Sequence, residues 1–360
     1  MAKVAVVILN WNGRDMMRQF LPYVVLHSTG ADVVVADNGS NDGSTDMLRR
    51  EFPAVRIVQL DRNYGFAEGY NQALDALVRQ YRAEGLTLPE YYVLLNSDVE
   101  TTPDWLCVLT DFMDLHLDVA ACQPKLRCQW NKGAFEYAGA CGGYIDAFGY
   151  PYCRGRLMRV VEDDYGQYDY LCDKDRMEGK MAVYDCLWAT GACLMIRRKD
   201  WEESGGLDGR FFAHQEEIDL CWRLRSRGRR VVCITQSMVY HQGGGTLPQG
   251  NPHKDFLNFR NNLLLLYKNL PAESLNKIMF IRFWLDALAS LQFLLVGQFG
   301  SFAAVWRARA EFRRMRKEFE TDRQENLGKA LVSPVPEQSD ISLLWRYYVK
   351  GVRRFSDLGV

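Results

Sequence analysis

The chain has 360 residues, of which 48% are hydrophobic, 12% aromatic and 25% charged, as in an ordinary folded globular protein. Such an aromatic content argues against disorder. Lys and Arg (44) nearly balance Asp and Glu (45), so no overall field would attract nucleic acid, and no nucleic-acid partner is expected. The length predicts a core domain with an appendage.

The cysteines and the first residues indicate an intracellular protein. None of the ten cysteines forms a CxxC pair, and several, including Cys193 and Cys233, lie in apolar runs, where a thiol behaves as a small hydrophobic group. Seven lie between Cys122 and Cys193, which leaves a zinc site there as a lesser alternative. The opening MAKVAVVILNWN lacks the features of a secretory signal, so we expect a cytoplasmic protein.

The first part of the chain alternates between strands and helices. Apolar runs rich in Val, Ile and Leu predict strands covered on both faces, and stretches of helical spacing separate them. The expected strands are 4–9, 32–36, 56–60 and 91–95, and the expected helices are 16–25, 45–52 and 69–82. This alternation predicts an α/β fold with an open, mostly parallel sheet, whose ligands bind at the carboxyl ends of its strands.

The remaining chain does not continue this regular alternation of strands and helices. A helix at 103–115 precedes a long Tyr-, Gly- and Asp-rich region at 123–185, which we interpret as an insertion on the acceptor side. Further predicted elements are strands at 186–196 and 230–234 and a helix at 218–227. Beyond residue 247 the chain is predicted to be largely helical, with a polar and mobile break at 321–340.

Asn, Asp and Gly crowd the loops that follow the first four predicted strands, at 10–13, 37–43, 61–65 and 96–100. Each loop alone could be a plain turn. Four in succession at one sheet edge favour a binding site. The strongest signal is Asn96-Ser97-Asp98, because it places a carboxylate, a ligand that hard divalent cations prefer, just past a buried strand.

Six segments carry a resemblance to a known family. They are ILNWNG at 8–13, VVVADNGSNDGSTDML at 33–48, NYGFAEGYNQAL at 63–74, YVLLNSDVETTPDWL at 92–106, ATGACLMIRRKDWEESGGLDGRFF at 189–212 and EEIDLCWRLRSRGRRVV at 216–232. In this order they resemble the family 2 glycosyltransferases of the GT-A fold, especially the bacterial rhamnosyltransferase-like members. The resemblance implies a Rossmann-like, mostly parallel sheet flanked by helices, with a helical C-terminal appendage.

The same resemblance implies that the chain divides into regions with different functions. Residues 1–245 would form the catalytic domain, with a nucleotide-sugar-binding half at 1–102 and a metal and acceptor half at 103–245. Residues 246–360 would form the helical C-terminal region.

By position, the resemblance implies that Asp37 contacts the nucleobase, that the 10–12 loop lies against the nucleoside, and that Asp98 binds Mg or Mn held by the donor diphosphate. A metal there would stabilise the charge that develops on the diphosphate as the glycosidic bond breaks. The family's DXD triplet is NSD here, which leaves one carboxylate where some members have two. The other residues expected at the donor are Asn10, Trp11, Asn12, Asn38, Gly39, Arg62, Asn63, Gly65, Asn71, Asn96 and Arg223.

The pair Glu216-Glu217 matches the family's acidic pair that supplies a general base. Glu217 stands where the family usually has Asp, so we favour it and keep Glu216 as the alternative, because one methylene can matter to a base. The competing interpretation is that both acids only begin a helix and complement its dipole. Gly191 and Asp219 are expected on the acceptor side, with Asp219 orienting the cluster or the diphosphate.

His241 is a candidate second metal ligand. It follows a strand-like segment at 238–240 and precedes three glycines at 243–245. A lone His is often structural, and that alternative stays open. The glycines permit either close backbone approach to a ligand or a flexible loop that closes over the donor.

The resemblance therefore implies an inverting enzyme that moves a sugar from a dTDP-rhamnose or UDP-hexose donor to a hydroxyl of a saccharide during surface polysaccharide synthesis. The helix expected on the membrane surface, described below, suggests that this saccharide is lipid-linked. A sugar nucleotidyltransferase would need Arg and Lys in a Gly-rich loop after the first strand, and ILNWNGRD offers only Arg14. A nicotinamide dehydrogenase would need GxGxxG there. A non-catalytic scaffold that binds a nucleotide sugar is the remaining alternative.

The segment 287–306 lacks charged residues and is long enough to cross a bilayer. Its apolar residues recur at helical spacing, and the basic cluster beyond it would prefer the cytoplasmic side: Arg307, Arg309, Arg313, Arg314, Arg316 and Lys317. A span would then leave the catalytic domain outside, away from cytoplasmic nucleotide sugars. We therefore expect an interfacial helix or hairpin on the inner membrane surface, with packing on the domain or in a homodimer as the alternative.

Overall fold

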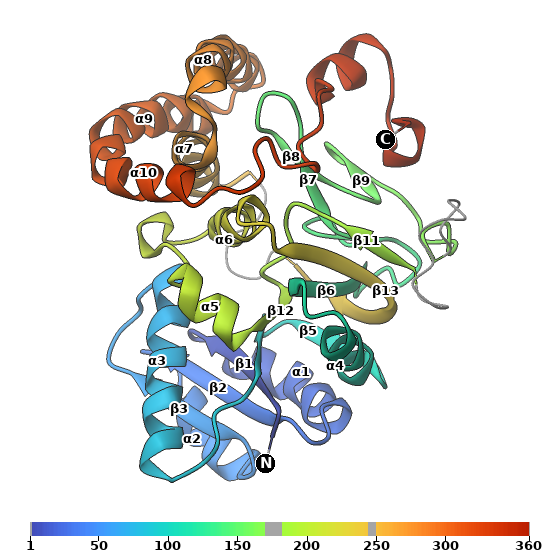
Figure 1. The fold of residues 1–360 in the computed structure, drawn as a ribbon, viewed down its shortest axis with the longest axis vertical. Helices are drawn as coiled ribbons and strands as arrows, with labels where there is room; N and C mark the ends of the chain where they lie inside the picture. The colour runs from blue at the N-terminus through green and yellow to red at the C-terminus, as the bar shows by residue number, and fades with distance from the viewer. Residues whose placement is uncertain (1, 170–181, 244–249, 360) are drawn as a thin grey trace.

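The computed structural model describes residues 2–169, 182–243 and 250–359 (Figure 1). Its core is a nine-stranded sheet in the order β11-β13-β6-β12-β4-β1-β2-β3, with β5 paired to β13. The strands are β1 (Val4–Asn10), β2 (Asp32–Asn38), β3 (Arg56–Leu60), β4 (Tyr91–Leu95), β5 (Val99–Thr101), β6 (Val119–Cys128), β11 (Val183–Asp185), β12 (Cys193–Arg197) and β13 (Arg230–His241).

The N-terminal half of the sheet, β3-β2-β1-β4, is parallel, as predicted. In this register Asn10 pairs with Asp37 and Asp37 with Gln59, so the loops after these strands meet at one edge. The other half is mixed, because β12 runs antiparallel to both β4 and β6. Since Cys193 at the start of β12 pairs with Leu95 at the end of β4, the segment before β12 also reaches this edge.

Helices cover both faces of the sheet, which is why its strands are continuously apolar. Alternate residues of β1 enter two separate clusters: Val6 packs with α1, α2 and α4, whereas Val7 packs with α3 and α6. The helices around the sheet are α1 (Arg14–His27), α2 (Ser44–Glu51), α3 (Ala67–Ala83), α4 (Trp105–Leu115), α5 (Arg198–Ser204) and α6 (Glu216–Ser226), with a 3-10 turn at Gly209–Phe211.

Three predicted boundaries in the middle of the chain are wrong. Residues 123–128, expected to begin the insertion, belong to the central strand β6, and the region after them forms a second small sheet. The strand expected at 186–196 is β12 alone, because the residues before it form a loop. The strand expected to end at 234 continues to His241 past an irregularity in its register. The small sheet comprises β7 (Gly143–Ile145), β8 (Pro151–Cys153), β9 (Arg156–Leu157) and β10 (Val160–Val161).

The C-terminal region is helical, as predicted, and its four helices lie together beyond α6 (Figure 1). The break expected at 321–340 is wrong in its first part, because a helix continues to Gly328. After it the chain docks on α6, where Glu337 is buried and accepts a 2.9 Å hydrogen bond from Arg225. The elements are α7 (Pro252–Asn269), α8 (Ala272–Leu295), α9 (Phe299–Met315) and α10 (Glu320–Gly328), with short helical turns at Arg316–Phe319, Trp345–Val349 and Phe355–Asp357.

The uncharged stretch at 287–306 is not one helix: α8 ends at Leu295 and α9 begins at Phe299. Within the described residues one helix, α8, has the length and composition to cross a membrane. Its most apolar 18-residue stretch has a mean hydropathy of 1.6, and 22% of that stretch is buried. The charged side chains of α8 at Arg282 and Asp286 are buried and paired with each other. Arg309, expected in the surface basic cluster, instead pairs with Asp286 in the interior.

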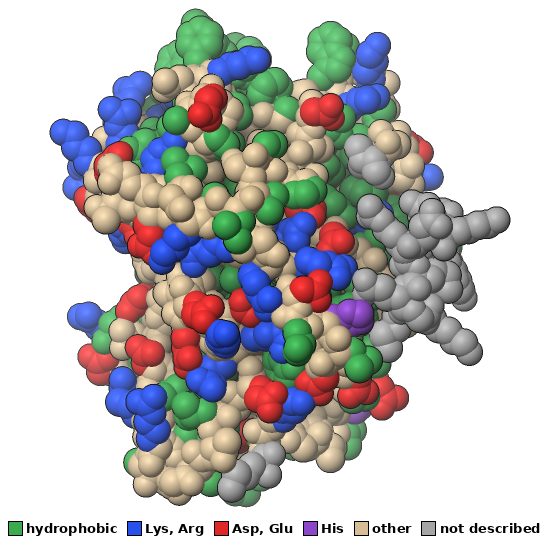
Figure 2. Space-filling view, viewed as in Figure 1, with side chains coloured by type: hydrophobic (Ala, Val, Ile, Leu, Met, Phe, Trp, Pro, Cys, Tyr) green, Lys and Arg blue, Asp and Glu red, His purple; other side chains and the backbone are tan. Residues whose placement is uncertain are grey.

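The opposite face of the α8–α9 hairpin is apolar and exposed. Hydrophobic side chains protrude over α8 at the upper end of the molecule (Figure 2). The exposed large residues are Phe280, Trp284, Leu288, Leu291, Leu294, Leu295, Val296, Phe299 and Trp306. This hairpin therefore separates a charged inner face from an apolar outer face.

Candidate active site

Asp98 lies just past the end of β4 and is buried against the end of β13. Its Oδ1 atom is 3.1 Å from Nε2 of His241, and its Oδ2 atom accepts a 3.1 Å hydrogen bond from the backbone N–H of Gly243. Asn96 Nδ2 lies 3.3 Å from the same Nε2 atom of His241. The structure therefore brings together Asn96, Asp98 and His241, and of the glycines at 243–245 it describes Gly243.

A second carboxylate, which the sequence did not single out, lies on the other side of the imidazole. Glu136 Oε1 is 3.2 Å from His241 Nδ1 in a buried ion pair. Burial alone would lower the pKa of His241, but the Asp98 and Glu136 carboxylates outweigh it and raise the pKa to about 10. Burial would likewise raise the pKa of Asp98, yet the charge of His241 holds it below its usual value.

Asp98 and His241 could bind one cation together once the His241 imidazole is neutral, because an imidazolium has no lone pair to offer a metal. In the structure the 3.1 Å between Oδ1 and Nε2 is a hydrogen-bond distance, so a cation bound there would replace the Nε2 proton. Among the described residues, no three His, Cys, Asp or Glu side chains form a metal site by themselves, whether around Asp98 or among the cysteines. The donor set fits Mg or Mn, which commonly take further ligands from substrate phosphates and water.

Glu216 and Glu217 begin α6 and are placed differently from Asp98. The Oε2 atoms of both are buried and lack a hydrogen-bond partner within the described residues. Burial raises the pKa of Glu217 to about 7. For Glu216, burial and then the charge of Glu217 raise the pKa well above its usual value. Helix-capping alone would leave both acids ionised and exposed, so this environment favours a group that exchanges a proton.

The turn before Glu216 has a strained backbone. Phe212, His214 and Gln215 all have positive φ angles, of 66°, 72° and 71°. Helix α7 holds this turn, because the side-chain amide of Asn261 donates to the carbonyl oxygens of Phe211, Ala213 and His214 at 2.8–3.0 Å. Positive φ at non-glycine residues costs free energy, and such strain is often kept where it aims a functional side chain.

His214 begins the acidic cluster at 214–219, but the sequence assigned it no role of its own. Its Nε2 atom is buried with no hydrogen-bond partner in the described chain. Burial, followed by the charges of Lys254 and His253, lowers the pKa of His214 to about 4, so its imidazole is neutral at physiological pH.

The segment before β12 links the cation-binding and proton-accepting groups. Gly191 packs on Glu217, since a Cβ atom at Gly191 would lie 3.8 Å from Cβ of Glu217 and 3.3 Å from Phe66. The next residue, Ala192, accepts a 2.9 Å hydrogen bond from the N–H of Asn96. A chain of contacts through Gly191 and Ala192 therefore connects Glu217 with Asn96, which lies two residues before Asp98.

Asn10 and Asp37 organise the loops after β1 and β2. Asp37 is fully buried, and its two oxygens accept from Asn10 Nδ2 and from the N–H of Ser40, each at 3.1 Å. Ser40 Oγ in turn accepts from the N–H of Asn12 at 2.9 Å. In this structure Asp37 is buried beneath the loop, whereas Trp11 is 49% exposed, and the expected contact of Asp37 with a base stays a prediction.

Five further residues expected at the donor lie in the neighbouring loops. Asn38 donates to Asn63 Oδ1 at 3.1 Å and to the Gly65 carbonyl at 2.9 Å. Gly39 has a φ of 72° and no room for a Cβ, which would lie 2.6 Å from the backbone of Arg62. The Arg62 side chain is exposed and stacks on Tyr64, with 4.7 Å between the guanidinium and the ring centre.

Three expected site residues form hydrogen bonds within the protein. Asn71 exchanges hydrogen bonds with the backbone of Leu207 at 2.7 and 3.1 Å. Buried Arg223 donates to the carbonyls of Ser204 and Gly206, and to Asp219 at 2.9 Å.

Asp219 is fully buried and also accepts from Lys268 Nζ at 2.8 Å and from Asn269 Nδ2 at 2.9 Å. These contacts lock α6 to α7. The polar groups of Arg223, Asn71 and Asp219 therefore have partners inside the protein, and their expected roles toward donor and acceptor stay predictions.

Comparisons with known proteins agree with this geometry. Residues 5–162 match the model of the glycosyl transferase family 2. The chain is 25% identical over 248 residues, 66% of this chain and 75% of the relative, to N-acetylglucosaminyl-diphospho-decaprenol L-rhamnosyltransferase of Mycobacterium tuberculosis. It is 24% identical over 258 residues to the O-antigen biosynthesis protein RfbC of Myxococcus xanthus, covering 71% of this chain and 18% of that protein.

Solved structures share the fold at low sequence identity. GalNAc-T7 with UDP, GalNAc and Mn2+ aligns with a TM-score of 0.56 at 14% identity, over 94% of this chain and 58% of that one. S. aureus TarS 1-349 in complex with UDP-GlcNAc aligns with a TM-score of 0.50 at 14% identity, over 91% and 89% of the two chains. Together with the six motifs, these findings show that the chain shares the fold of solved glycosyltransferases and is similar to the family 2 glycosyltransferases, including a rhamnosyltransferase.

Proposed function

We propose that the protein is an inverting glycosyltransferase that moves a sugar from a dTDP-rhamnose or UDP-hexose donor to a hydroxyl of a lipid-linked saccharide in surface polysaccharide synthesis. The observation that carries the proposal is Glu217: a half-buried residue with one buried carboxyl oxygen and a pKa of about 7, connected to Asn96 beside Asp98 by contacts through Gly191 and Ala192. A general base works best when its pKa is near the working pH. The name of the mycobacterial relative supports a rhamnosyl donor and a prenyl-linked acceptor.

In the proposed reaction Glu217 accepts the proton of the acceptor hydroxyl. The acceptor oxygen forms a bond to the anomeric carbon as the bond to the donor diphosphate breaks, and the nucleoside diphosphate leaves with that electron pair. A divalent metal on Asp98 and His241 would neutralise negative charge on the leaving diphosphate. A single displacement of this kind inverts the anomeric centre.

We assign the exposed residues Trp11, Asn12 and Arg62 to direct contact with the nucleotide. Asn10, Asp37, Asn38, Gly39, Asn63 and Gly65 shape the loops that carry them. Asn96 orients His241, and Gly191 positions Glu217. We retain residues 1–245 as the proposed catalytic domain, with α7 of the 246–360 region holding the turn before its base.

We further propose that the α8–α9 hairpin lies on the inner membrane surface. Its outer face exposes Trp284, Phe280 and Leu288, and exposed basic residues follow on α9, a combination typical of interfacial helices. High salt or alkaline carbonate should release the protein from membranes, and truncation before Lys277 should abolish attachment. Soluble behaviour at low salt would contradict this assignment, while a homodimer through the same face would appear by light scattering.

The direct test of the function is a panel of nucleotide sugars assayed for release of nucleoside diphosphate, with and without Mg or Mn. We expect metal-stimulated release from one donor class, whereas a non-catalytic scaffold would bind donors without turnover. NMR of the product anomeric centre tests the stereochemistry, and retention would refute the single displacement.

A further inference from the structure

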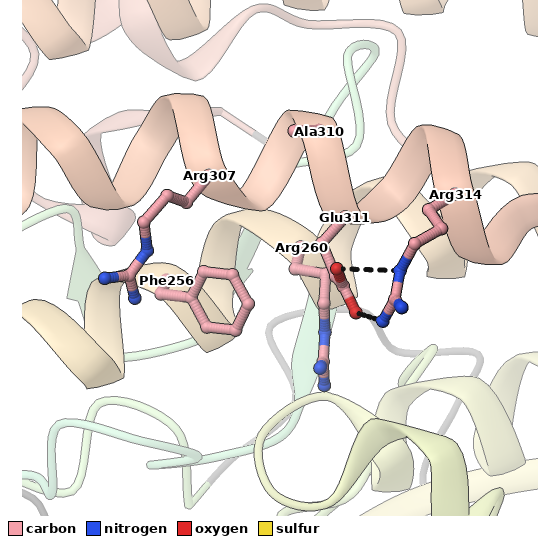
Figure 3. Close-up of a pocket in the computed structure, with 6 residues that line it drawn as sticks. All are labelled: Phe256, Arg260, Arg307, Ala310, Glu311 and Arg314. Atoms are coloured by element: carbon pink, nitrogen blue, oxygen red, sulfur yellow. Dashed lines mark hydrogen bonds and ion pairs between the residues drawn. The ribbon is translucent and has the colours of Figure 1, made fainter.

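An arginine-lined hollow of about 570 Å³ lies between α7 and α9 (Figure 3). Three guanidinium groups share it with one carboxylate, so the positive charge is in excess. Arg307 and Arg314 are exposed at its rim, whereas Arg260 is buried. The residues that line it are Phe256, Arg260, Arg307, Ala310, Glu311 and Arg314.

The charges of this hollow are only partly compensated. Arg314 pairs with Glu311, with 3.1 Å between Nε and Oε2, while Arg307 lies beside the Phe256 ring at 5.2 Å (Figure 3). Within the described residues no carboxylate forms an ion pair with Arg307. Burial lowers the pKa of Arg260, and Glu311 opposes this effect only in part. A hollow of this kind gains free energy by binding an anion.

The buried arginine is fixed in place before any ligand binds. Its Nε atom donates to Asn261 Oδ1 and its Nη2 atom donates to the Phe211 carbonyl, both at 2.9 Å. These contacts also join the hollow to the strained turn that precedes Glu216. Arginine favours phosphate because its planar group can donate two parallel hydrogen bonds.

The α9 side of the hollow is close in sequence to the apolar face of the hairpin. Trp306 precedes Arg307 on α9, is 39% exposed, and contacts Phe283 of α8 at 6.2 Å between ring centres. The hollow therefore lies between an apolar surface and the turn that leads to the base. A ligand with a hydrocarbon chain, a phosphate group and a sugar in that order would match this sequence of surfaces.

We propose that the hollow binds the diphosphate group of a prenyl-linked saccharide acceptor. The prenyl chain lies along the α8–α9 apolar face, and the saccharide extends toward Glu217. This inference rests on the proposed function and deepens it, because it assigns the site that recognises the acceptor's diphosphate.

Farnesyl diphosphate is the probe that tests the hollow by itself. The variant Arg307→Gln/Arg314→Gln removes the two exposed charges and leaves Arg260, which also holds the Phe211 carbonyl. The matched control Arg313→Gln/Lys317→Gln removes two exposed charges of the same segment that do not line the hollow. We expect the hollow variant to bind farnesyl diphosphate at least about tenfold more weakly, because charge-assisted hydrogen bonds are lost, and the control to bind as the wild type does.

A third variant, Glu311→Gln, removes the one carboxylate and should tighten binding of farnesyl diphosphate several-fold. Equal effects in the hollow and control variants, or unchanged affinity in all three variants, would overturn the proposal. Phosphatidylglycerol vesicles distinguish the two sources of phosphate: both double variants should lose vesicle binding equally. Loss of vesicle binding confined to the hollow variant, with unchanged farnesyl diphosphate affinity, would instead identify a site for phospholipid headgroups.

Failure of the proposed function would be visible separately. Nucleoside diphosphate release from the donor into water should be unchanged in the hollow variant, because its substitutions lie outside the donor loops. If the wild type releases nucleoside diphosphate from no nucleotide sugar, the transferase proposal fails, while the farnesyl diphosphate measurements still decide whether the hollow recognises a lipid diphosphate.

Discussion

The two acidic groups at the active edge of the sheet are held in opposite ways. Asp98 accepts hydrogen bonds from His241 and Gly243, and its pKa lies below the usual value because of the neighbouring imidazolium. Glu217 has a buried oxygen without a partner in the described chain, and its pKa is raised to about 7. The protein thus stabilises a negative charge at one site and disfavours it at the other.

This difference suits the two halves of a displacement. A carboxylate that stays ionised can meet a cation at the diphosphate, whereas a carboxylate that gains free energy on protonation can take a proton from the acceptor. The supporting structure also differs. Asp98 and His241 lie at the ends of sheet strands, but Glu217 depends on a strained turn that Asn261 of the C-terminal region holds.

The largest expected effect comes from removing the proton acceptor. Glu217→Gln should lower turnover by about 10²–10⁴-fold, the usual loss for a general base, while nucleotide binding stays intact. Single-turnover rates with a saturating donor measure the loss, and calorimetric titration of the nucleotide measures binding. A nearly silent Glu217→Gln beside an inactive Glu216→Gln would reverse the assignment within the pair, and two silent variants would place the base elsewhere.

Asp98→Ala tests the charge-stabilising side. We expect turnover to fall by about 10²–10³-fold and its stimulation by Mg or Mn to disappear, because electrostatic stabilisation of the leaving group is lost. The readout is the rate of nucleoside diphosphate release across a metal titration. The surface substitution Asp46→Ala is the matched control, since Asp46 lies on the exposed side of α2. Undiminished metal stimulation in Asp98→Ala would contradict the proposed ligand.

The parallel half of the fold was predictable because the patterns that indicate it lie between residues that are close in the sequence. Apolar runs of strand length alternate with helical spacing, and parallel strands necessarily bring their following loops to one edge. The positions of Asn10, Asp37 and Asp98 at this edge followed from that rule. Their individual contacts did not follow, and Asp37 proved to be buried beneath the loop.

What the sequence could not reveal depends on distant partners. Arg223 and Asn71 were assigned to the donor, yet their hydrogen bonds go to backbone groups around residues 204–207. Glu136 lies in a region without periodicity, so nothing local indicated its ion pair with His241. A polar residue's type shows that it needs partners, but only the tertiary structure shows whether those partners are ligand or protein.

The pH dependence of the rate tests how Glu217 differs from Asp98. Because Glu217 acts as a base only when it is ionised, kcat/KM should fall about tenfold per pH unit below its pKa of about 7 and level off above it. The profile should be measured with a donor and a metal concentration that are saturating throughout. A limb centred near 4.5, the ordinary value for Glu, would show that burial does not tune this carboxyl group.

The smallest predicted effect concerns stability. Burial raises the folded-state pKa of Glu217 from 4.5 to about 7. The contribution of this carboxyl group to the free energy of unfolding is therefore complete below pH 4.5 and is lost as the pH rises through 7. At pH 8 the wild type therefore carries the cost of a buried charge, which Glu217→Gln removes. The variant should gain about 1–3 kcal/mol in free energy of unfolding at pH 8 and nothing at pH 4.

Urea unfolding at both pH values measures this change. Asp219→Asn is the contrasting control, because Asp219 compensates the buried charges of Arg223 and Lys268. Its loss should destabilise the fold by about 3–5 kcal/mol at pH 8. Opposite signs for the two substitutions would show that one buried acid braces α6 while the other is kept at a cost for chemistry. A stability loss in Glu217→Gln at pH 8 would instead mean that this carboxylate is structural.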